Sequence, residues 1–324
     1  MLIRGTLFWE SPVLKARLNL VVGALLFSTG GVAIKTATLT GWQLSCFRSF
    51  VAGIAILLLV PKARRGWSWR SLLVAIPYAT TFTLFTLANK LTTAANAIFL
   101  QDTAPFYILL LGPMLLGERI RRKDIAFMLA LALGLALIFG SIRAPMDTAT
   151  NPDLGNLLAA CAGVSWALTV IGLRRLAVRS REHDEQPEAA LVTGCFVASL
   201  VAVSFAFPVQ SPSVSNWLIV LYLGVFQIGL AYVLITEGMR YIPALESSLL
   251  LLVEPVFSPI WAWLLLAESP GTLAILGGGV VILATGIHSV QQGRKTVLPQ
   301  ELSLIHISEP TRRYAISYAV FCLK

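Results

Sequence analysis

The sequence is a series of apolar runs of about 20 residues, separated by short polar segments. A helix of that length crosses the hydrocarbon core of a bilayer, which is about 30 Å thick. In lipid the backbone must satisfy its own hydrogen bonds, and long apolar runs do so as helices rather than barrel strands. Only 13% of the residues are charged, against about 25% in a typical soluble domain. The sequence therefore predicts an all-α polytopic membrane protein. Ten transmembrane helices are expected, over residues 18–37, 43–60, 71–89, 94–115, 124–141, 154–173, 189–208, 216–236, 244–266 and 271–290.

Basic residues are distributed unevenly between the segments that join these runs. If the N-terminus lies inside, the internal segments carry 18 Lys and Arg residues, whereas the external segments carry Lys35, Lys90 and Arg143. This bias follows the positive-inside rule. We therefore expect both native termini to be cytoplasmic. The formal net charge of +9 then sets the topology and does not indicate binding to nucleic acid.

One stretch of the sequence occurs twice. DTAPFYILLLGPMLLGE begins at Asp102, and LVEPVFSPIWAWLLLAE begins at Leu252. Aligning Pro105 with Pro255 also aligns Glu118 with Glu268, at an offset of 150 residues. The chain crosses the membrane an odd number of times between the two copies, so they run in opposite directions. Two inverted five-helix repeats are the architecture of many secondary transporters.

The repeat defines the expected domain organisation. Residues 1–17 form a cytoplasmic N-terminal segment, 18–141 the first five-helix repeat and 154–290 the second, inverted repeat. The segment 302–324 contains an apolar run too short to span a membrane, and it follows a natural cytoplasmic ending. We interpret it as a non-native read-through tail, with an interfacial helix as the alternative.

Three stretches resemble the EamA-type permeases of the drug/metabolite transporter (DMT) superfamily. They are FRSFVAG, ANAIFLQDTAPFYILLLGPMLLGERI and YIPALESSLLLLVEPVFSPIWAWLLLAE. The resemblance covers about residues 18–290. It implies a ten-helix carrier in the bacterial inner membrane, often an exporter of amino acids or related metabolites. Its central cavity would be lined mainly by spans 1, 3, 4, 6, 8 and 9.

Two acids lie well inside the expected spans, Asp102 and Glu254, each close to a proline. An acid inside a span is costly and usually faces the bundle interior or a water-filled path. Either carboxyl could bind a polar ligand or take up a proton. The alternative is an internal pairing that locks the repeats together, with Arg48 as partner. For Glu254 both interpretations stay open, whereas for Asp102, nearer the external end, the structural one is favoured.

Uncharged polar and aromatic side chains supply the other candidates for a binding cavity, although packing is the commoner role of such residues in membrane helices. The substrate-binding or coupling candidates besides the two acids are Gln101, Tyr78, Trp166, Gln227 and Tyr232. Structural or gating roles are expected for Arg48, Pro105, Pro255, Glu118 and Glu268. The alternative for Arg48 is that its planar guanidinium holds a substrate carboxylate.

The favoured function is a secondary carrier that exports small polar or amphipathic metabolites by alternating access, driven by the substrate gradient or by protons. The partners are then a small-molecule substrate and the lipid bilayer, and the sequence leaves open whether the carrier works alone or as a homodimer. The alternatives are a membrane-embedded enzyme or flippase acting on lipid-linked substrates, and a non-transporting scaffold or receptor. An enzyme would normally show a large polar loop or clustered His, Asp and Glu residues. The sequence has no paired metal spacing and no G-x-x-x-x-G-K-[ST] loop, so neither metal nor cofactor is expected.

Overall fold

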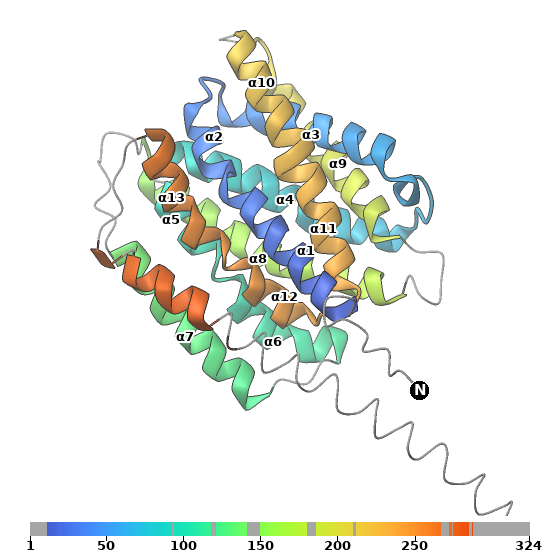
Figure 1. Cartoon of the computed structure of the whole chain (residues 1–324). Helices are drawn as coiled ribbons and strands as arrows, with labels where there is room; N and C mark the ends of the chain where they lie inside the picture. Colours follow the sequence, from blue (N-terminus) through green and yellow to red (C-terminus); the bar gives the residue numbers. More distant parts are fainter. Residues whose placement is uncertain are drawn as a thin grey trace, which may run out of the picture.

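The computed structural model describes residues 12–92, 94–117, 121–140, 150–179, 186–209, 212–266, 272–273, 275–284 and 287. Over these residues the regular structure is entirely helical (Figure 1). Glu118, Glu268 and the tail 302–324 lie outside the described residues. The first helix begins at Pro12, within the expected N-terminal segment 1–17.

Six helical stretches of the described chain are long and apolar enough to cross a membrane. They agree with six of the ten expected spans, with ends that differ by a few residues. Two of them are built from more than one element: α1 (Pro12–Ser28) continues into α2 (Gly30–Thr36), and α10 (Val214–Tyr222) continues through the π-helical segment η4 (Leu223–Leu230) into α11 (Ala231–Met239). The other four are α3 (Gly41–Leu59), α4 (Trp69–Leu91), α8 (Pro152–Arg179) and α9 (Pro187–Ala206).

The fourth and ninth expected spans are not continuous helices, which corrects the sequence prediction. The first is divided into α5 (Ala94–Gln101) and α6 (Ala104–Leu116), and the second into α12 (Ala244–Leu251) and α13 (Glu254–Leu266). Every one of these bounds recurs at an offset of 150 residues. Pro105 and Pro255 lie in the first turn of the second helix of each pair, where a residue without an N–H group is tolerated. The break therefore belongs to the repeated unit.

Helix α7 (Arg122–Gly140) corresponds to the expected fifth span, and residues 275–284 form a shorter apolar helix within the tenth. The two helices lie together at one side of the bundle (Figure 1). They approach closely at Gly134, where an added Cβ would lie 2.6 Å from a methyl group of Val281. A separate apolar cluster, which includes Leu131 and Val281, joins this pair to Leu249 and Val256 of the second broken span.

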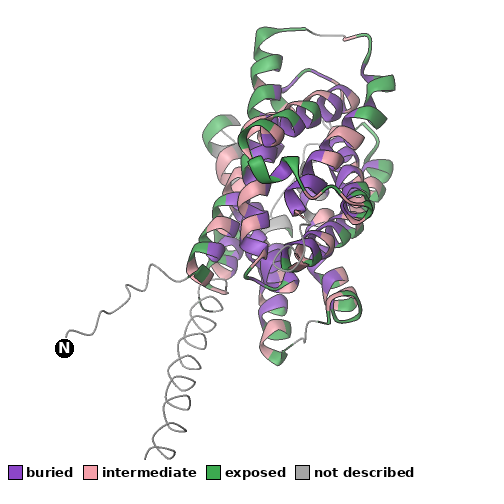
Figure 2. Ribbon diagram, turned by 90° about the vertical axis from the view of Figure 1, so that its right-hand side faces the viewer, coloured by how far each residue is buried: buried purple, intermediate pink, exposed green. Residues whose placement is uncertain are grey.

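The central bundle is held by contacts between helices from the two halves of the chain. Helix α4 packs on α8, α3 packs on α9 and α1 packs on α11. Their main apolar cluster includes Leu20, Ile56, Tyr78, Leu173 and Tyr232. Large apolar side chains such as Leu110, Met114, Leu200 and Leu265 are exposed. Figure 2 shows exposed positions on the outside of the bundle. An apolar outer surface of this extent suits contact with lipid.

Candidate functional site

A small cavity lies at the centre of the bundle. It has a volume of about 30 Å³, which is room for very few water molecules. Its walls come from α1, α3, α4, α5, η4, α11 and α13, and so from both halves of the chain. The lining residues are Phe27, Arg48, Thr81, Phe82, Phe85, Gln101, Gln227, Tyr232 and Glu254.

Irregular backbone surrounds this cavity. The breaks at 102–103 and 252–253, the end of α1 at Ser28 and the π-helical segment η4 each lie next to a lining residue. At the end of α1, the Ser28 carbonyl accepts a hydrogen bond from Ser258 (3.3 Å), and the Ser28 hydroxyl accepts one from the Trp261 indole (2.7 Å). Broken helices at membrane depth are tolerated where they are buried in protein or line a cavity, and such breaks form the binding sites of many transporters.

Arg48 is fully buried in α3, with an exposed fraction of 0%. One terminal nitrogen, Nη2, donates to the Phe82 carbonyl (3.2 Å) and to the Thr86 hydroxyl. The guanidinium carbon lies 5.2 Å from the centre of the Phe82 ring, within range of a cation–π interaction. The other two nitrogens, Nε and Nη1, have no hydrogen-bond partner among the described residues.

The two acids of the sequence prediction occupy different positions relative to the cavity. Glu254 lines it, whereas Asp102, although buried, is not among the lining residues. Asp102 lies in the break between α5 and α6, and its Oδ2 has no partner in the described structure. Arg48 forms an ion pair with neither acid among the described residues. The expected locking pair is therefore not formed in this conformation.

An aromatic cluster forms one side of the cavity and supports it from behind. The Tyr232 ring lies 5.0 Å from Phe27, 4.8 Å from Tyr78, 5.3 Å from Phe82 and 5.9 Å from Trp166, between ring centres. Of these residues, Phe27, Phe82 and Tyr232 line the cavity. Tyr78 and Trp166 are buried behind them, and the Tyr78 hydroxyl lies 3.3 Å from the Cys195 sulfur.

The structure thus brings four of the seven predicted binding candidates to the cavity wall: Gln101, Gln227, Tyr232 and Glu254. Sequence reasoning did not single out Phe27 or Thr81. A signal was present for the α4 wall, because Tyr78, Phe82 and Phe85 follow one another at helical spacing and so share one face. For Phe27 the only signal was its position just before the STGG stretch where α1 ends.

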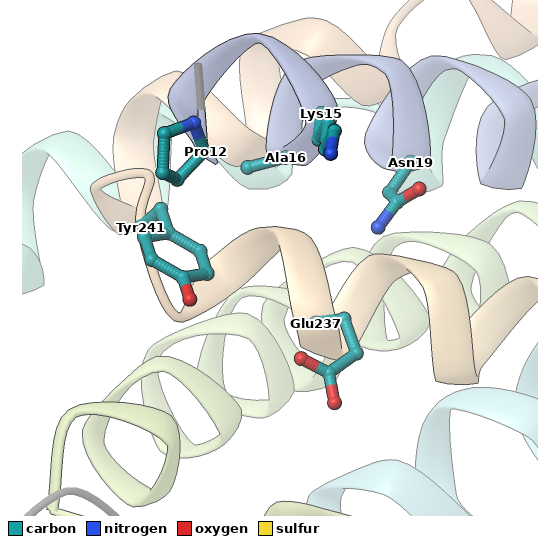
Figure 3. A pocket seen from close by; sticks show the side chains of 6 residues that line it. All are labelled: Pro12, Lys15, Ala16, Asn19, Glu237 and Tyr241. Carbon is teal, nitrogen blue, oxygen red and sulfur yellow. The ribbon is translucent and has the colours of Figure 1, made fainter. Parts of the chain in front are cut away.

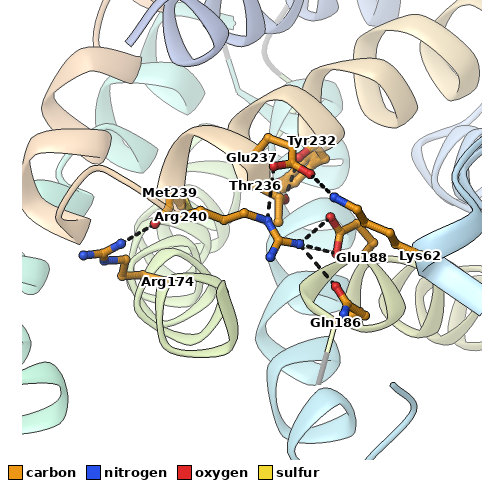
Figure 4. Close-up of polar contacts among 9 residues, drawn as sticks. All are labelled: Lys62, Arg174, Gln186, Glu188, Tyr232, Thr236, Glu237, Met239 and Arg240. Atoms are coloured by element: carbon orange, nitrogen blue, oxygen red, sulfur yellow. Dashed lines mark hydrogen bonds and ion pairs between the residues drawn. The ribbon is translucent and has the colours of Figure 1, made fainter. Parts of the chain in front are cut away.

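Ion pairs join the helices at the end of the bundle where α1 begins. Buried Arg17 of α1 pairs with buried Glu246 of α12 (3.0 Å). Arg240 pairs with Glu188 at the start of α9 (2.9 Å) and with Glu237 of α11 (3.2 Å), and Glu237 also contacts Lys62 (2.8 Å), as Figure 4 shows. From the sequence alone, these cations were visible only as part of the positive-inside bias.

A larger pocket of about 180 Å³ opens at the same end of the bundle, between α1 and α11 (Figure 3). It is lined by Pro12, Lys15, Ala16, Asn19, Glu237 and Tyr241. Glu237 also belongs to the ion-pair network. The pocket is an open surface hollow with exposed Lys15 and Tyr241 at its edge. The central cavity, with its buried unpaired polar atoms, is the stronger candidate for a substrate site.

These features define a multi-pass membrane protein with broken helices around a central polar cavity, the arrangement of a carrier. The sequence matches the EamA-like transporter family twice, over residues 14–140 and 153–290. The chain therefore belongs to the EamA-like transporter family, as its resemblance to DMT permeases predicted.

Relatives of similar length support this assignment. The pseudopaline exporter CntI of Pseudomonas aeruginosa is 24% identical over 82% of this chain and 92% of its own. An uncharacterized transporter of Archaeoglobus fulgidus is 27% identical over 82% of this chain and 92% of its own. A solved crystal structure matches with a TM-score of 0.71 at 22% identity, over 87% of this chain and 98% of that chain, which shows a shared fold.

Proposed function

We propose that the protein is a secondary transporter of the bacterial inner membrane that exports small polar or amphipathic metabolites, such as amino acids, by alternating access. The observation that carries this proposal is the central cavity, which broken helices from both halves of the chain enclose. A cavity with a charged group of each sign, two amides and an aromatic wall suits an amphipathic ligand. At about 30 Å³ it is too small for one, so transport requires the halves to move apart.

The transporter architecture is proposed to be ten helices in two inverted repeats. The recurrence of the helix breaks at an offset of 150 residues supports this proposal. The helix contacts support it too. In the two halves α1 corresponds to α8 and α11 corresponds to α4, and the packing of α1 on α11 has its counterpart in the packing of α8 on α4. With the positive-inside bias, the native termini are then cytoplasmic. A reporter fused after Lys295 should give a cytoplasmic signal, and an external signal would contradict the inverted arrangement.

Alternating access needs a closure on each side of the cavity. The ion pairs Arg17–Glu246 and Arg240–Glu188 close the proposed cytoplasmic side. On the opposite side the described contacts are hydrogen bonds, such as Lys90 to the Ala37 carbonyl (2.9 Å) and Asn216 to the Thr38 hydroxyl (2.8 Å). If the contacts on one side break while those on the other side hold, the cavity is exposed to one side of the membrane at a time.

Export is tested by following release of candidate substrates from cells. Residues 1–300 would be expressed in a bacterial host loaded with a panel of amino acids and related metabolites. We expect faster release of at least one compound than from cells with an empty vector. Release at the empty-vector rate across the panel would contradict export of this class.

Proton coupling is the proposed role of Glu254. Its carboxyl lines the cavity and makes no hydrogen bond to the described residues, and a buried charged carboxylate without a partner is costly. Protonation of the Glu254 carboxylate removes that cost, and so does pairing of the carboxylate with a cationic group of the substrate. In reconstituted vesicles, Glu254→Gln should remove the response of transport to an imposed pH gradient. Asp153→Asn, which changes an exposed acid at the start of α8, is the matched control and should keep it.

A further inference from the structure

The unpaired nitrogens of Arg48 are the strongest unexplained polar feature of the cavity. Three of its five N–H groups, one on Nε and two on Nη1, have no partner among the described residues. The side chain has not turned outward to reach water, because it is fully buried. It is also a lining residue of the cavity.

The protein itself compensates this charge only in part. The Phe82 carbonyl, the Thr86 hydroxyl and the Phe82 ring interact with the guanidinium, but none of them carries a negative charge. A buried cation without a counter-charge is among the costliest features of a folded chain. A bound anion that is not part of the protein would supply the missing counter-charge.

We infer that Arg48 binds the carboxylate of the transported substrate. This inference rests on the proposed transport function and names the group that its central cavity recognises. A hydrogen bond that a guanidinium N–H donates to a carboxylate is charge-assisted and about twice as strong as a hydrogen bond between neutral groups. The cavity carries one cation, Arg48, and one carboxyl group, Glu254. This balance favours a singly charged carboxylate over a phosphate dianion, which Glu254 would repel.

The other lining groups fit the remainder of such a molecule. Gln227 presents an unpaired Oε1, and Glu254 presents a carboxyl, so both accept hydrogen bonds from an ammonium group. Phe27, Phe85 and Tyr232 offer apolar surface to a side chain. Recognition of the carboxylate by Arg48 therefore distinguishes an acid from an amine or amide that is otherwise identical.

The test compares substrate analogues on the unchanged protein, so it does not depend on a variant that folds poorly. Vesicles containing the full-length chain would be loaded with radiolabelled amino acids, their α-amides and the corresponding decarboxylated amines. Release would be corrected for leakage from protein-free vesicles. We expect the acids to be released about tenfold or more faster than the matching amides and amines. Arg48→Gln should abolish this preference, whereas Arg65→Gln, at an exposed loop position, should keep it.

The outcomes separate the inference from the proposed function. Equal release of acids, amides and amines would overturn the role of Arg48 and leave transport standing. Retention of the acid preference in Arg48→Gln would overturn it as well. If no compound of any kind leaves the vesicles faster than by leakage, the proposed function fails and the inference fails with it. Arg48→Lys, which keeps the charge but not the planar donor array, should retain part of the preference.

Discussion

The two broken spans have the same backbone plan and different chemistry. In both, an eight-residue helix, a two-residue break and a thirteen-residue helix follow one another, with a proline in the first turn after the break. In the first span the acid, Asp102, lies in the break and is not among the residues that line the cavity. In the second the acid, Glu254, begins the next helix and lines the cavity. A displacement of two positions in the repeat therefore decides which acid faces the cavity.

The surroundings of the two breaks also differ. The first break packs against α8 at Gly163, where an added Cβ would lie 2.7 Å from the Leu100 carbonyl oxygen. The second is joined to α1 by hydrogen bonds to Ser28, and its first helix carries Glu246 of the buried ion pair. Both spans pack in the apolar core, and the second is held by polar contacts as well. Polar contacts can exchange partners during transport.

The largest expected effect comes from the buried ion pair of the second span. Glu246→Gln leaves Arg17 buried without its counter-charge, and we expect a loss of about 3 kcal/mol in stability. Thermal unfolding in detergent measures it. The double variant Arg17→Met with Glu246→Leu should recover much of the loss, because it removes both charges. A double variant as unstable as the single one would show that the two residues act independently.

A somewhat smaller effect is expected at the packed break of the first span. Gly163→Ala places a Cβ against backbone oxygens that cannot move aside as a flexible side chain can. We expect a loss of about 1–3 kcal/mol in stability, as for overpacked cores. Gly140→Ala in α7, where an added Cβ meets nothing within 4 Å, is the matched control. Equal thermal stability of the two variants would remove the packing argument.

Substitutions of the two acids should differ in their effect on transport rather than in their effect on stability. Glu254→Gln should remove the pH-dependent part of substrate release, because its carboxyl faces the cavity. Asp102→Asn should leave that part in place, because the residue is not on the cavity wall. Release from vesicles at two external pH values compares them. If Asp102→Asn also removes the pH dependence, the distinction between the two spans fails.

The smallest effect is expected from the prolines. Pro105→Ala and Pro255→Ala each restore one N–H group in the first turn of a helix, where it needs no intrahelical partner. Each should change stability by less than about 1 kcal/mol. Pro255→Ala should slow substrate release more than Pro105→Ala, because it adjoins Glu254. A larger effect of Pro105→Ala would assign the functional break to the first span.

Much of the fold could be predicted from the sequence, because the bilayer restricts which secondary structures can cross it. Apolar runs of sufficient length must form helices in lipid, so the helical class and the positions of the spans follow from run length. The duplication was also visible, because Pro105 recurs as Pro255 and Glu118 recurs as Glu268 at the same offset. Membership of the EamA-like family followed from the same stretches.

Only the tertiary structure decided which side chains meet. The sequence left a functional and a structural role open for Glu254 and favoured the structural role for Asp102, and folding brought only Glu254 to the cavity wall. It favoured a structural role for Arg48 over binding of a substrate carboxylate, and folding buried two of its nitrogens without a partner among the described residues. Run length and hydropathy report how deep a residue lies in the membrane. They do not report which way a helix is rotated or where it breaks, because those depend on contacts between helices far apart in the chain.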